Sequence, residues 1–172
     1  RPFTITALHR LENMLQGTTA VRQISLLQEA DKPSVYQASI YSDATSTGGI
    51  GVVANAKDFA KPIYAACEAP EWLYSRLSER KTQIIALELF ATLVAIETFG
   101  KYISGRPVLI FVDSVAVEQA LVKGYSKLDD LNDMIGKFWS ACERLQLKVW
   151  IDRVPSDLNP ADKPSRRIFD ET

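Results

Sequence analysis

The sequence is poor in the residues that support disulfide frameworks and histidine chemistry. Its 172 residues include two cysteines, Cys67 and Cys142, and one histidine, His9. The two cysteines are far apart in the sequence, so they form neither a C-x-x-C metal knuckle nor a disulfide framework. We therefore expect reduced, structural thiols of the kind found in intracellular proteins.

Long apolar runs are missing as well. The most apolar stretches, residues 84–96 and 108–112, are interrupted by polar residues or end early. Neither reaches the roughly 18 apolar residues that a membrane span needs. The N-terminal residues also lack the basic region, apolar core and cleavage site of a secretory signal. We expect a soluble, non-secreted protein, and the absence of an initial methionine leads us to expect a piece of a longer chain.

The chain has no excess of charge of either sign, because 20 Lys and Arg residues are balanced by 21 Asp and Glu residues. With 47% hydrophobic and 24% charged residues, the composition is that of one ordinary globular domain. A neutral total gives no general attraction for nucleic acids, so phosphate binding would depend on local basic clusters. Such clusters occur at Arg76, Arg80 and Lys81, at Lys123 and Lys127, and at Lys163, Arg166 and Arg167.

The pattern along the chain indicates a helical connector, residues 1–34, followed by an α/β domain, residues 35–172. Alternating apolar runs and turn residues predict strands at 35–42, 49–54, 63–67, 108–112 and 147–154. Helical spacing predicts helices at 81–102, 115–122 and about 129–145, and a short helix beginning near 160. The fold class that follows is a five-stranded mixed sheet, with its first three strands antiparallel, flanked by helices. Three aspartates near the start of the third helix, Asp129, Asp130 and Asp133, are interpreted as partners of the helix dipole.

Two carboxylates occupy positions that favour apolar residues. Asp43 ends a strand expected in the middle of the sheet, where Asp is rare; a turn-initiating Asp is the structural alternative. Glu88 has apolar neighbours one helical turn away on both sides, such as Ile84 and Ala91. A buried carboxylate needs a cation, a hydrogen-bond partner or a raised pKa. For Glu88, the alternative is a salt bridge to an arginine at the edge of the core.

Two further carboxylates follow the buried fourth strand and the last loop. Asp113 ends the apolar run 108–112, at the strand end where open α/β sheets usually keep their chemistry. Asp162 opens the last helix. Helix capping is the structural alternative for Asp113, or its neighbour Ser114, and for Asp162. Asp152 and Asp157 are rivals of Asp162 because they lie near the same loop.

Together the four carboxylates are more informative than any one alone. A sheet that brings its first and fourth strands together would place Asp43 beside Asp113, with a helix supplying Glu88. Crowded like charges destabilise one another unless cations hold them, and hard oxygen ligands suit Mg²⁺ or Mn²⁺. Two such ions could activate a water on one side of a phosphodiester and stabilise the leaving oxygen on the other.

In these four carboxylates the chain resembles the ribonuclease H family. That family has an Asp on its first strand, a Glu on its first helix, an Asp ending its fourth strand and an Asp on its last helix. The likeness is closest to the RNase H domains of hepadnaviruses and tyrosine-recombinase retrotransposons. It runs from about residue 35 to 167. The stretches that carry it are residues 41–48 (YSDATSTG), 86–91 (ALELFA) and, most specifically, 154–166 (VPSDLNPADKPSR).

The resemblance implies endonucleolytic hydrolysis of the RNA strand of RNA/DNA hybrids, with Asp43, Glu88, Asp113 and Asp162 as catalytic and metal-binding residues. It implies two Mg²⁺ ions, which Mn²⁺ could replace, and RNA distinguished through its 2′-hydroxyls. Ser114 and Arg166 are implied as substrate contacts. Residues 1–34 would correspond to the end of a reverse transcriptase of the same polyprotein. The location would be inside the cell, in the cytoplasm, the nucleus or a virus-like particle, with no membrane partner.

The sequence departs from many cellular family members in one respect. They carry a histidine in the loop before the last Asp, where this chain has Ser156 and Asp157. A neutral imidazole for proton or product shuttling is therefore missing, as it is in the hepadnaviral type. The main alternative function is a catalytically inactive RNase H-like scaffold that binds nucleic acid or protein. A transposase or integrase is disfavoured because those enzymes place their Glu on a late helix.

Overall fold

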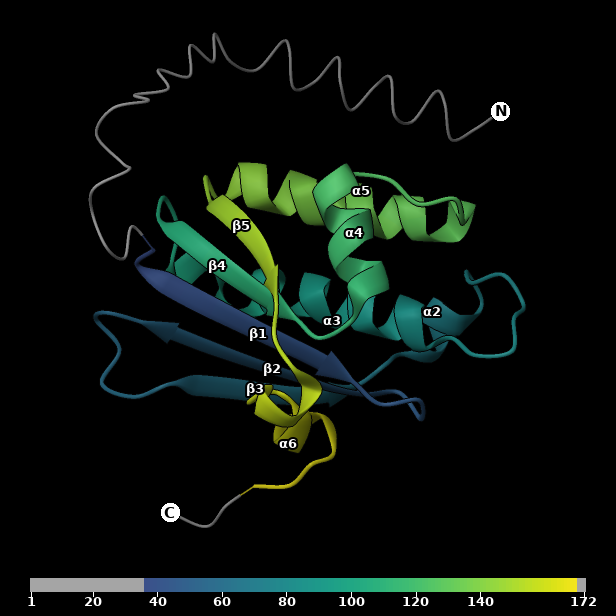
Figure 1. Ribbon diagram of the computed structural model, residues 1–172, viewed down its shortest axis with the longest axis horizontal. Coiled ribbons are helices and arrows are strands. Elements are labelled where there is room, and N and C mark those ends of the chain that lie inside the picture. The colour runs from purple at the N-terminus through teal and green to yellow at the C-terminus, as the bar shows by residue number, and fades with distance from the viewer. Residues whose placement is uncertain (1–35, 170–172) are drawn as a thin grey trace, which may run out of the picture. The chain divides into compact units, whose positions relative to one another are not determined.

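The computed structural model describes residues 36–169, and a five-stranded mixed sheet lies at their centre (Figure 1). The strand order is β3-β2-β1-β4-β5. Strands β1 to β3 are antiparallel neighbours, whereas β4 runs parallel to both β1 and β5. The strands are β1 (Ala38–Ala44), β2 (Gly49–Ala56), β3 (Ile63–Glu68), β4 (Pro107–Val112) and β5 (Lys148–Arg153). The predicted fold class is confirmed, and the predicted connector, residues 1–34, lies outside the described residues.

Helices cover the two faces of the sheet unequally (Figure 1). Helix α3 packs against β1 and β2 on one face, with α5 packed against α3, while the short helix α6 contacts β1, β2 and β3. The helices are α2 (Glu71–Tyr74), α3 (Ile84–Phe99), α4 (Val115–Lys123), α5 (Asp129–Arg144) and α6 (Asp162–Ser165), with 3-10 turns at Gly100–Tyr102 and Ser156–Leu158. None of the described helices is long and apolar enough to span a membrane.

Alternation along β1 sends neighbouring side chains to opposite faces. Ser42 faces α3, where its hydroxyl oxygen lies 3.0 Å from that of Thr92 in a hydrogen bond. Asp43 faces α6, where its carboxylate accepts a hydrogen bond from Ser165. Strand β1 therefore makes a side-chain hydrogen bond to α3 from one face and to α6 from the other.

Two glycines of β2 allow α6 to lie directly on the sheet. A Cβ at Gly51 would clash with the main-chain carbonyl of Ala161 and the amide of Ser165, and a Cβ at Gly49 would clash with the Ser165 carbonyl. Because Gly51 is paired with Asp43 across the β1–β2 ladder, this close approach brings α6 to the strand position that carries the first carboxylate.

Helix α3 differs from its prediction in length and surroundings. It begins at Ile84 and its α-helical part ends at Phe99, and the last predicted turn, Gly100–Tyr102, is 3-10. Packed between the sheet and α5, it buries residues on several sides, such as Leu87, Leu89 and Ile96. An extra four-residue helix, α2, precedes it; a segment of one turn has no periodicity to detect.

Among the predicted dipole partners, Asp130 has a more specific role. Its side chain is 6% exposed, forms an ion pair with Arg80 and accepts a hydrogen bond from the Ser78 amide at 2.8 Å. It thus fixes the connection before α3 against the start of α5. Asp133 is four residues from Lys137 and pairs with it on the helix surface, at 2.7 Å. The thiols of Cys67 and Cys142 are both free in the structure.

Candidate metal and nuclease site

The four predicted carboxylates come from four elements that meet at the carboxyl ends of β1 and β4. Asp43 lies within β1, Glu88 in α3, Asp113 directly after β4 and Asp162 at the first position of α6. Strands β1 and β4 are parallel neighbours, paired as far as Tyr41 and Phe111. Both strands therefore end at the same edge of the sheet.

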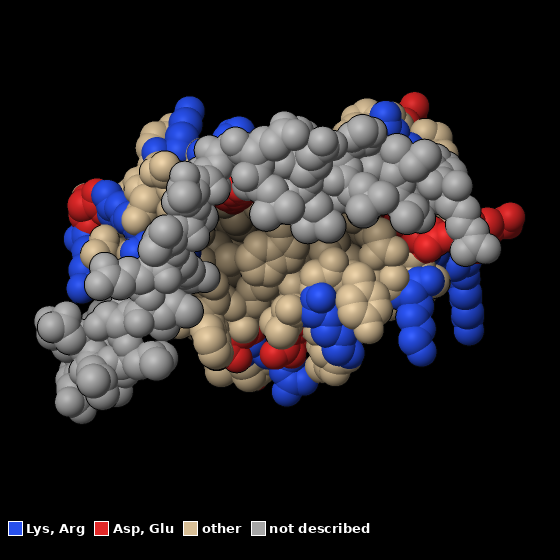
Figure 2. Space-filling view, turned by 90° about the horizontal axis from the view of Figure 1, so that it is seen from above, with Lys and Arg blue, Asp and Glu red and all other residues tan. Residues whose placement is uncertain are grey.

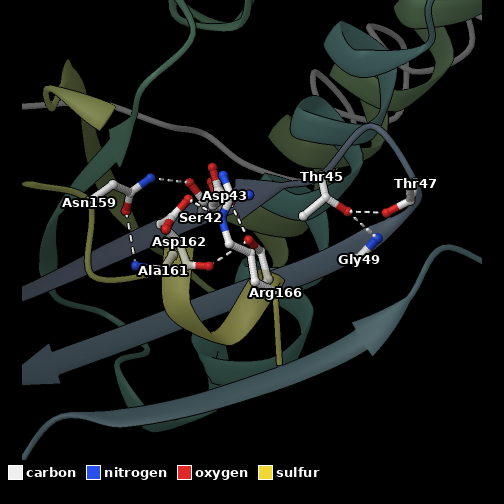
Figure 3. Close-up of polar contacts among 10 residues, drawn as sticks. Ser42, Asp43, Thr45, Thr47, Gly49, Asn159, Ala161, Asp162 and Arg166 are labelled. Atoms are coloured by element: carbon white, nitrogen blue, oxygen red, sulfur yellow. Dashed lines mark hydrogen bonds and ion pairs between the residues drawn. The ribbon is translucent and has the colours of Figure 1, made fainter. Parts of the chain in front are cut away.

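Asp43 is the most buried of the four, at 6% exposure. Burial raises the pKa of its carboxyl, the Ser165 hydrogen bond lowers it, and the negative charges of Asp113 and Asp162 raise it further. The turn-initiating alternative is wrong, because Asp43 pairs with Gly51 in the ladder and the turn itself begins at Thr45. Figure 3 shows Asp43, Asp162 and Arg166 gathered at α6, apart from the Thr45 turn.

Glu88 is half-buried beside the same strand ends. Burial raises the pKa of its carboxyl to about 7, the Ser114 hydroxyl lowers it, and Asp113 and Asp43 raise it. One of its oxygens, Oε2, is buried without a hydrogen-bond partner. Among the described residues no lysine or arginine forms an ion pair with Glu88, so the alternative of a salt bridge is not what the structure contains.

Ser114 and Arg166, the predicted substrate contacts, both contact these carboxylates. Ser114 is the N-cap residue of α4, but its side chain makes no capping hydrogen bond; its hydroxyl instead lowers the pKa of the neighbouring Glu88 carboxyl. Arg166 donates from Nε to Oδ1 of Asp162 at 2.8 Å, four residues away. Asp152 and Asp157 are exposed and neither is among the charges that act on Asp43.

Two side chains that position the site have no local sequence signal. Ser165 bonds to Asp43 across 122 positions of sequence, and its hydroxyl also lies 2.8 Å from the Asp162 carbonyl. Asn159 is buried; it donates to the Ser42 carbonyl at 3.0 Å and accepts from the Ala161 amide at 3.1 Å (Figure 3). Both residues lie within the motif 154–166, which was the only available pointer to them.

The donor set fits a divalent cation. All four groups offer hard oxygen ligands, the pKa values of Asp43 and Glu88 are raised partly by crowding, and one Glu88 oxygen has no partner. Within residues 36–169, however, no three acidic, histidine or cysteine side chains are already grouped as ligands of one ion. Asp43 and Asp162 instead each direct an oxygen at a side chain of α6 or its C-cap, Ser165 and Arg166 respectively.

Three residues of the predicted basic clusters are paired with carboxylates of the same chain. Arg80 pairs with Asp130, Arg166 with Asp162, and Arg167 with Glu68 at 3.0 Å. Where described residues are visible in Figure 2, the Lys and Arg side chains are scattered and do not form one broad patch. At these three positions, phosphate binding would require an ion pair to exchange partners.

Comparison with solved structures establishes the class of fold. The N-terminal RNase H domain of a Mycobacterium tuberculosis protein, solved as a fusion with maltose-binding protein, has a TM-score of 0.54 and 16% identity over 77% of this chain and 93% of that one. RNase H1 of the halophilic archaeon Halobacterium salinarum has a TM-score of 0.54 and 17% identity, covering 76% and 94%. LC11-RNase H1, isolated from compost, has a TM-score of 0.53 and 21% identity, covering 74% and 91%.

These likenesses show that the described domain has the ribonuclease H fold. No protein-family model and no curated protein sequence matches the chain. The activity of this chain is therefore argued from its own carboxylates.

Proposed function

We propose that this chain is a metal-dependent endonuclease that hydrolyses the RNA strand of RNA/DNA hybrids. The observation that carries the proposal is the convergence of Asp43, Glu88, Asp113 and Asp162 at one edge of an RNase H-type sheet. A domain with a purely structural role gains nothing from a buried Glu88 oxygen that has no partner. The RNase H1 structures of similar fold support the same substrate class.

In this proposal the four carboxylates hold two Mg²⁺ ions, or Mn²⁺ in their place. Bound there, the ions would activate a water and stabilise the leaving oxygen of the phosphodiester. The protein's own contribution is positional: Ser165 orients Asp43, and Ser114 orients Glu88. Ser114 and Arg166 lie beside the acids, where a hybrid backbone would pass, and are the proposed substrate contacts.

We also propose the biological setting that the sequence resemblance implies. The chain would be the RNase H domain of a retroelement or pararetrovirus reverse transcriptase, working inside the cell beside its polymerase, with the hybrid as its nucleic-acid partner. Residues 1–34 would connect the two domains. A polymerase neighbour would also add hybrid affinity to a chain whose basic and acidic residues nearly balance.

A catalytically inactive scaffold of the same fold is the second candidate. The observation that favours it is that, in the described part of the chain, no three potential ligands are already grouped around one ion position. The scaffold requires nothing of the carboxylates beyond their present contacts. It therefore predicts that neutralising them leaves its binding unchanged.

Cleavage of a labelled RNA/DNA hybrid tests the proposal, with duplex DNA and duplex RNA as controls, in Mg²⁺, in Mn²⁺ and in chelator. We expect metal-dependent cutting that is specific for the hybrid. Asp113→Asn and Asp162→Asn should lower it by more than about 100-fold, beyond the loss typical of outer-shell partners of a metal. Asp152→Asn and Asp157→Asn, on nearby exposed carboxylates, should cut normally.

Absence of cutting by the folded wild type, both alone and joined to its polymerase, would favour the scaffold. If Asp152→Asn and Asp162→Asn lowered the rate of hybrid cleavage equally, Asp162 would have been wrongly assigned as the fourth carboxylate. Cutting that appears only with the polymerase attached supports the nuclease and locates the missing hybrid affinity in the neighbour.

A further inference from the structure

Arg166 directly contacts the proposed fourth metal ligand. Its guanidinium donates to Asp162 at 2.8 Å, and its charge also acts on Asp43. The charge of Arg166 lowers the pKa of Asp43. Within residues 36–169, no Lys or Arg charge lowers the pKa of Glu88 in the same way. Arg166 thus places a positive charge in direct contact with the carboxylate cluster.

The backbone that carries Arg166 is held against the sheet, whereas its side chain is exposed. Pro164 and Ser165 are buried, and the Ser165 hydroxyl ties α6 to Asp43. The side chain of Arg166 is 57% exposed and that of Asp162 39%. An exposed ion pair of this kind is weak, whereas a guanidinium binds phosphate through paired, charge-assisted hydrogen bonds. Exchange of the carboxylate for a phosphate therefore needs only a side-chain rotation.

We propose that Arg166 is a displaceable counter-ion that makes cation binding at Asp162 depend on the nucleic-acid substrate. Without substrate, Arg166 occupies an oxygen of Asp162 and repels an incoming divalent cation. When a hybrid binds, Arg166 moves to a backbone phosphate and leaves Asp162 open as a ligand. This rests on the proposed function only in taking Asp162 as a metal ligand and the hybrid as the substrate.

The consequence is positive coupling between hybrid and cation. If Arg166 opposes the cation before substrate arrives and releases Asp162 afterwards, each ligand must raise the affinity for the other by the same factor. The domain would then hold its ions poorly on its own, which agrees with the absence of a preformed three-ligand group among the described residues.

The test is calorimetric titration of the full chain with Mn²⁺ alone, at fixed ionic strength and without nucleic acid. Removing the counter-ion in Arg166→Ala should tighten Mn²⁺ binding by about two- to fivefold, the range that an exposed ion pair accounts for. Arg167→Ala is the matched control, because Arg167 is the next residue, is 53% exposed and pairs with Glu68 through the same nitrogen. It should bind Mn²⁺ as the wild type does.

A second measurement follows Arg166 on the substrate. Hybrid binding in chelator should weaken in Arg166→Ala, and its dependence on log salt should become shallower by about one, as expected for the loss of one phosphate contact. Arg166→Lys, which keeps the charge, should restore both the weak Mn²⁺ binding and most of the salt dependence.

The outcomes separate this inference from the nuclease itself. Unchanged or weaker Mn²⁺ binding in Arg166→Ala would overturn the inference, as would an equal effect of Arg167→Ala, even if the wild type cuts hybrid. Tighter Mn²⁺ binding in Arg166→Ala alone supports the counter-ion, even if no cutting is found and the nuclease proposal fails. Absence of Mn²⁺ binding in every variant would overturn the inference too.

Discussion

Asn159 donates a hydrogen bond from Nδ2 to the main-chain carbonyl of Ser42, at 3.0 Å, and so holds the loop before α6 against the strand of Asp43. The same side chain accepts from the Ala161 amide, one residue before Asp162. One buried amide thus connects the first carboxylate to the fourth. The separation of Asp43 from Asp162 should depend on it more than on any surface contact.

Asn159→Ala should therefore impair both stability and cleavage. Leaving the buried Ser42 carbonyl and Ala161 amide without partners costs about 1–3 kcal/mol each at most. Denaturant unfolding measures the stability, and the hybrid assay measures the activity. Asn132→Ala is the control, because Asn132 makes the same pair of contacts with Ser126, away from the carboxylates. It should lose stability and keep its rate; equal rate loss in both variants would contradict the positioning role.

Glu88→Gln should change how the stability of the metal-free protein depends on pH. The folded pKa, about 7, lies above the ordinary 4.5, so Glu88 takes up a proton on folding between these values. Stability due to the protonated form is complete below about pH 4.5 and is lost as pH rises through 7. The variant should match wild type near pH 4.5 and exceed it by about 1–3 kcal/mol near pH 8. Parallel stability curves in chelator would show that Glu88 is not desolvated.

Gly51→Ala should push α6 away from the sheet. The new methyl group would meet the backbone of Ala161 and Ser165, which cannot rotate away as a side chain could. We expect a loss of about 1–3 kcal/mol, as for other overpacked sites, and a larger proportional loss of cleavage because Asp162 moves from Asp43. Asn55→Ala, at an exposed position of the same strand, should affect neither. A variant with normal rate would show that α6 can shift without consequence.

Asp130→Asn should be far more damaging than Asp129→Asn. Both residues lie in the first turn of α5, so a dipole effect alone would cost each variant a few tenths of a kcal/mol, up to about 1 kcal/mol. Asp130 also pairs with Arg80 while nearly buried, and its loss leaves that guanidinium without its partner, a change that costs about 3–5 kcal/mol for buried pairs. Thermal unfolding of the two variants measures this difference. Similar unfolding midpoints would mean that Asp130 acts only on the helix dipole, as Asp129 does.

The positions of the strands could be predicted because each has a local pattern. Alternation and turn residues marked all five to within a few residues, and Gly124 ends α4 in the left-handed conformation that favours glycine. The neighbouring positions of β1 and β4 are not encoded by any local pattern; they were considered only as the arrangement that would bring Asp43 beside Asp113. The one-turn helix α2 could not be seen because four residues contain no period.

Three of the candidate carboxylates, Asp43, Glu88 and Asp113, were predictable because they follow or interrupt apolar runs, and Asp162 was predictable from the motif 154–166. Their partners were not. The bond between Ser165 and Asp43 joins residues at opposite ends of the domain, and Ser114 acts on the pKa of Glu88 where the sequence indicated a helix cap or a substrate contact. The pair between Asp162 and Arg166 is the exception, since a spacing of four residues across a short helix could have indicated it.

The four carboxylates belong to β1, α3, the end of β4 and α6, elements that are far apart along the chain. During biosynthesis, the segment bearing Asp43 emerges long before the segment bearing Asp162. A nascent copy therefore cannot assemble the four carboxylates until its last segment has been made. If the cluster acts as proposed, cleavage begins only once α6 has folded onto the sheet.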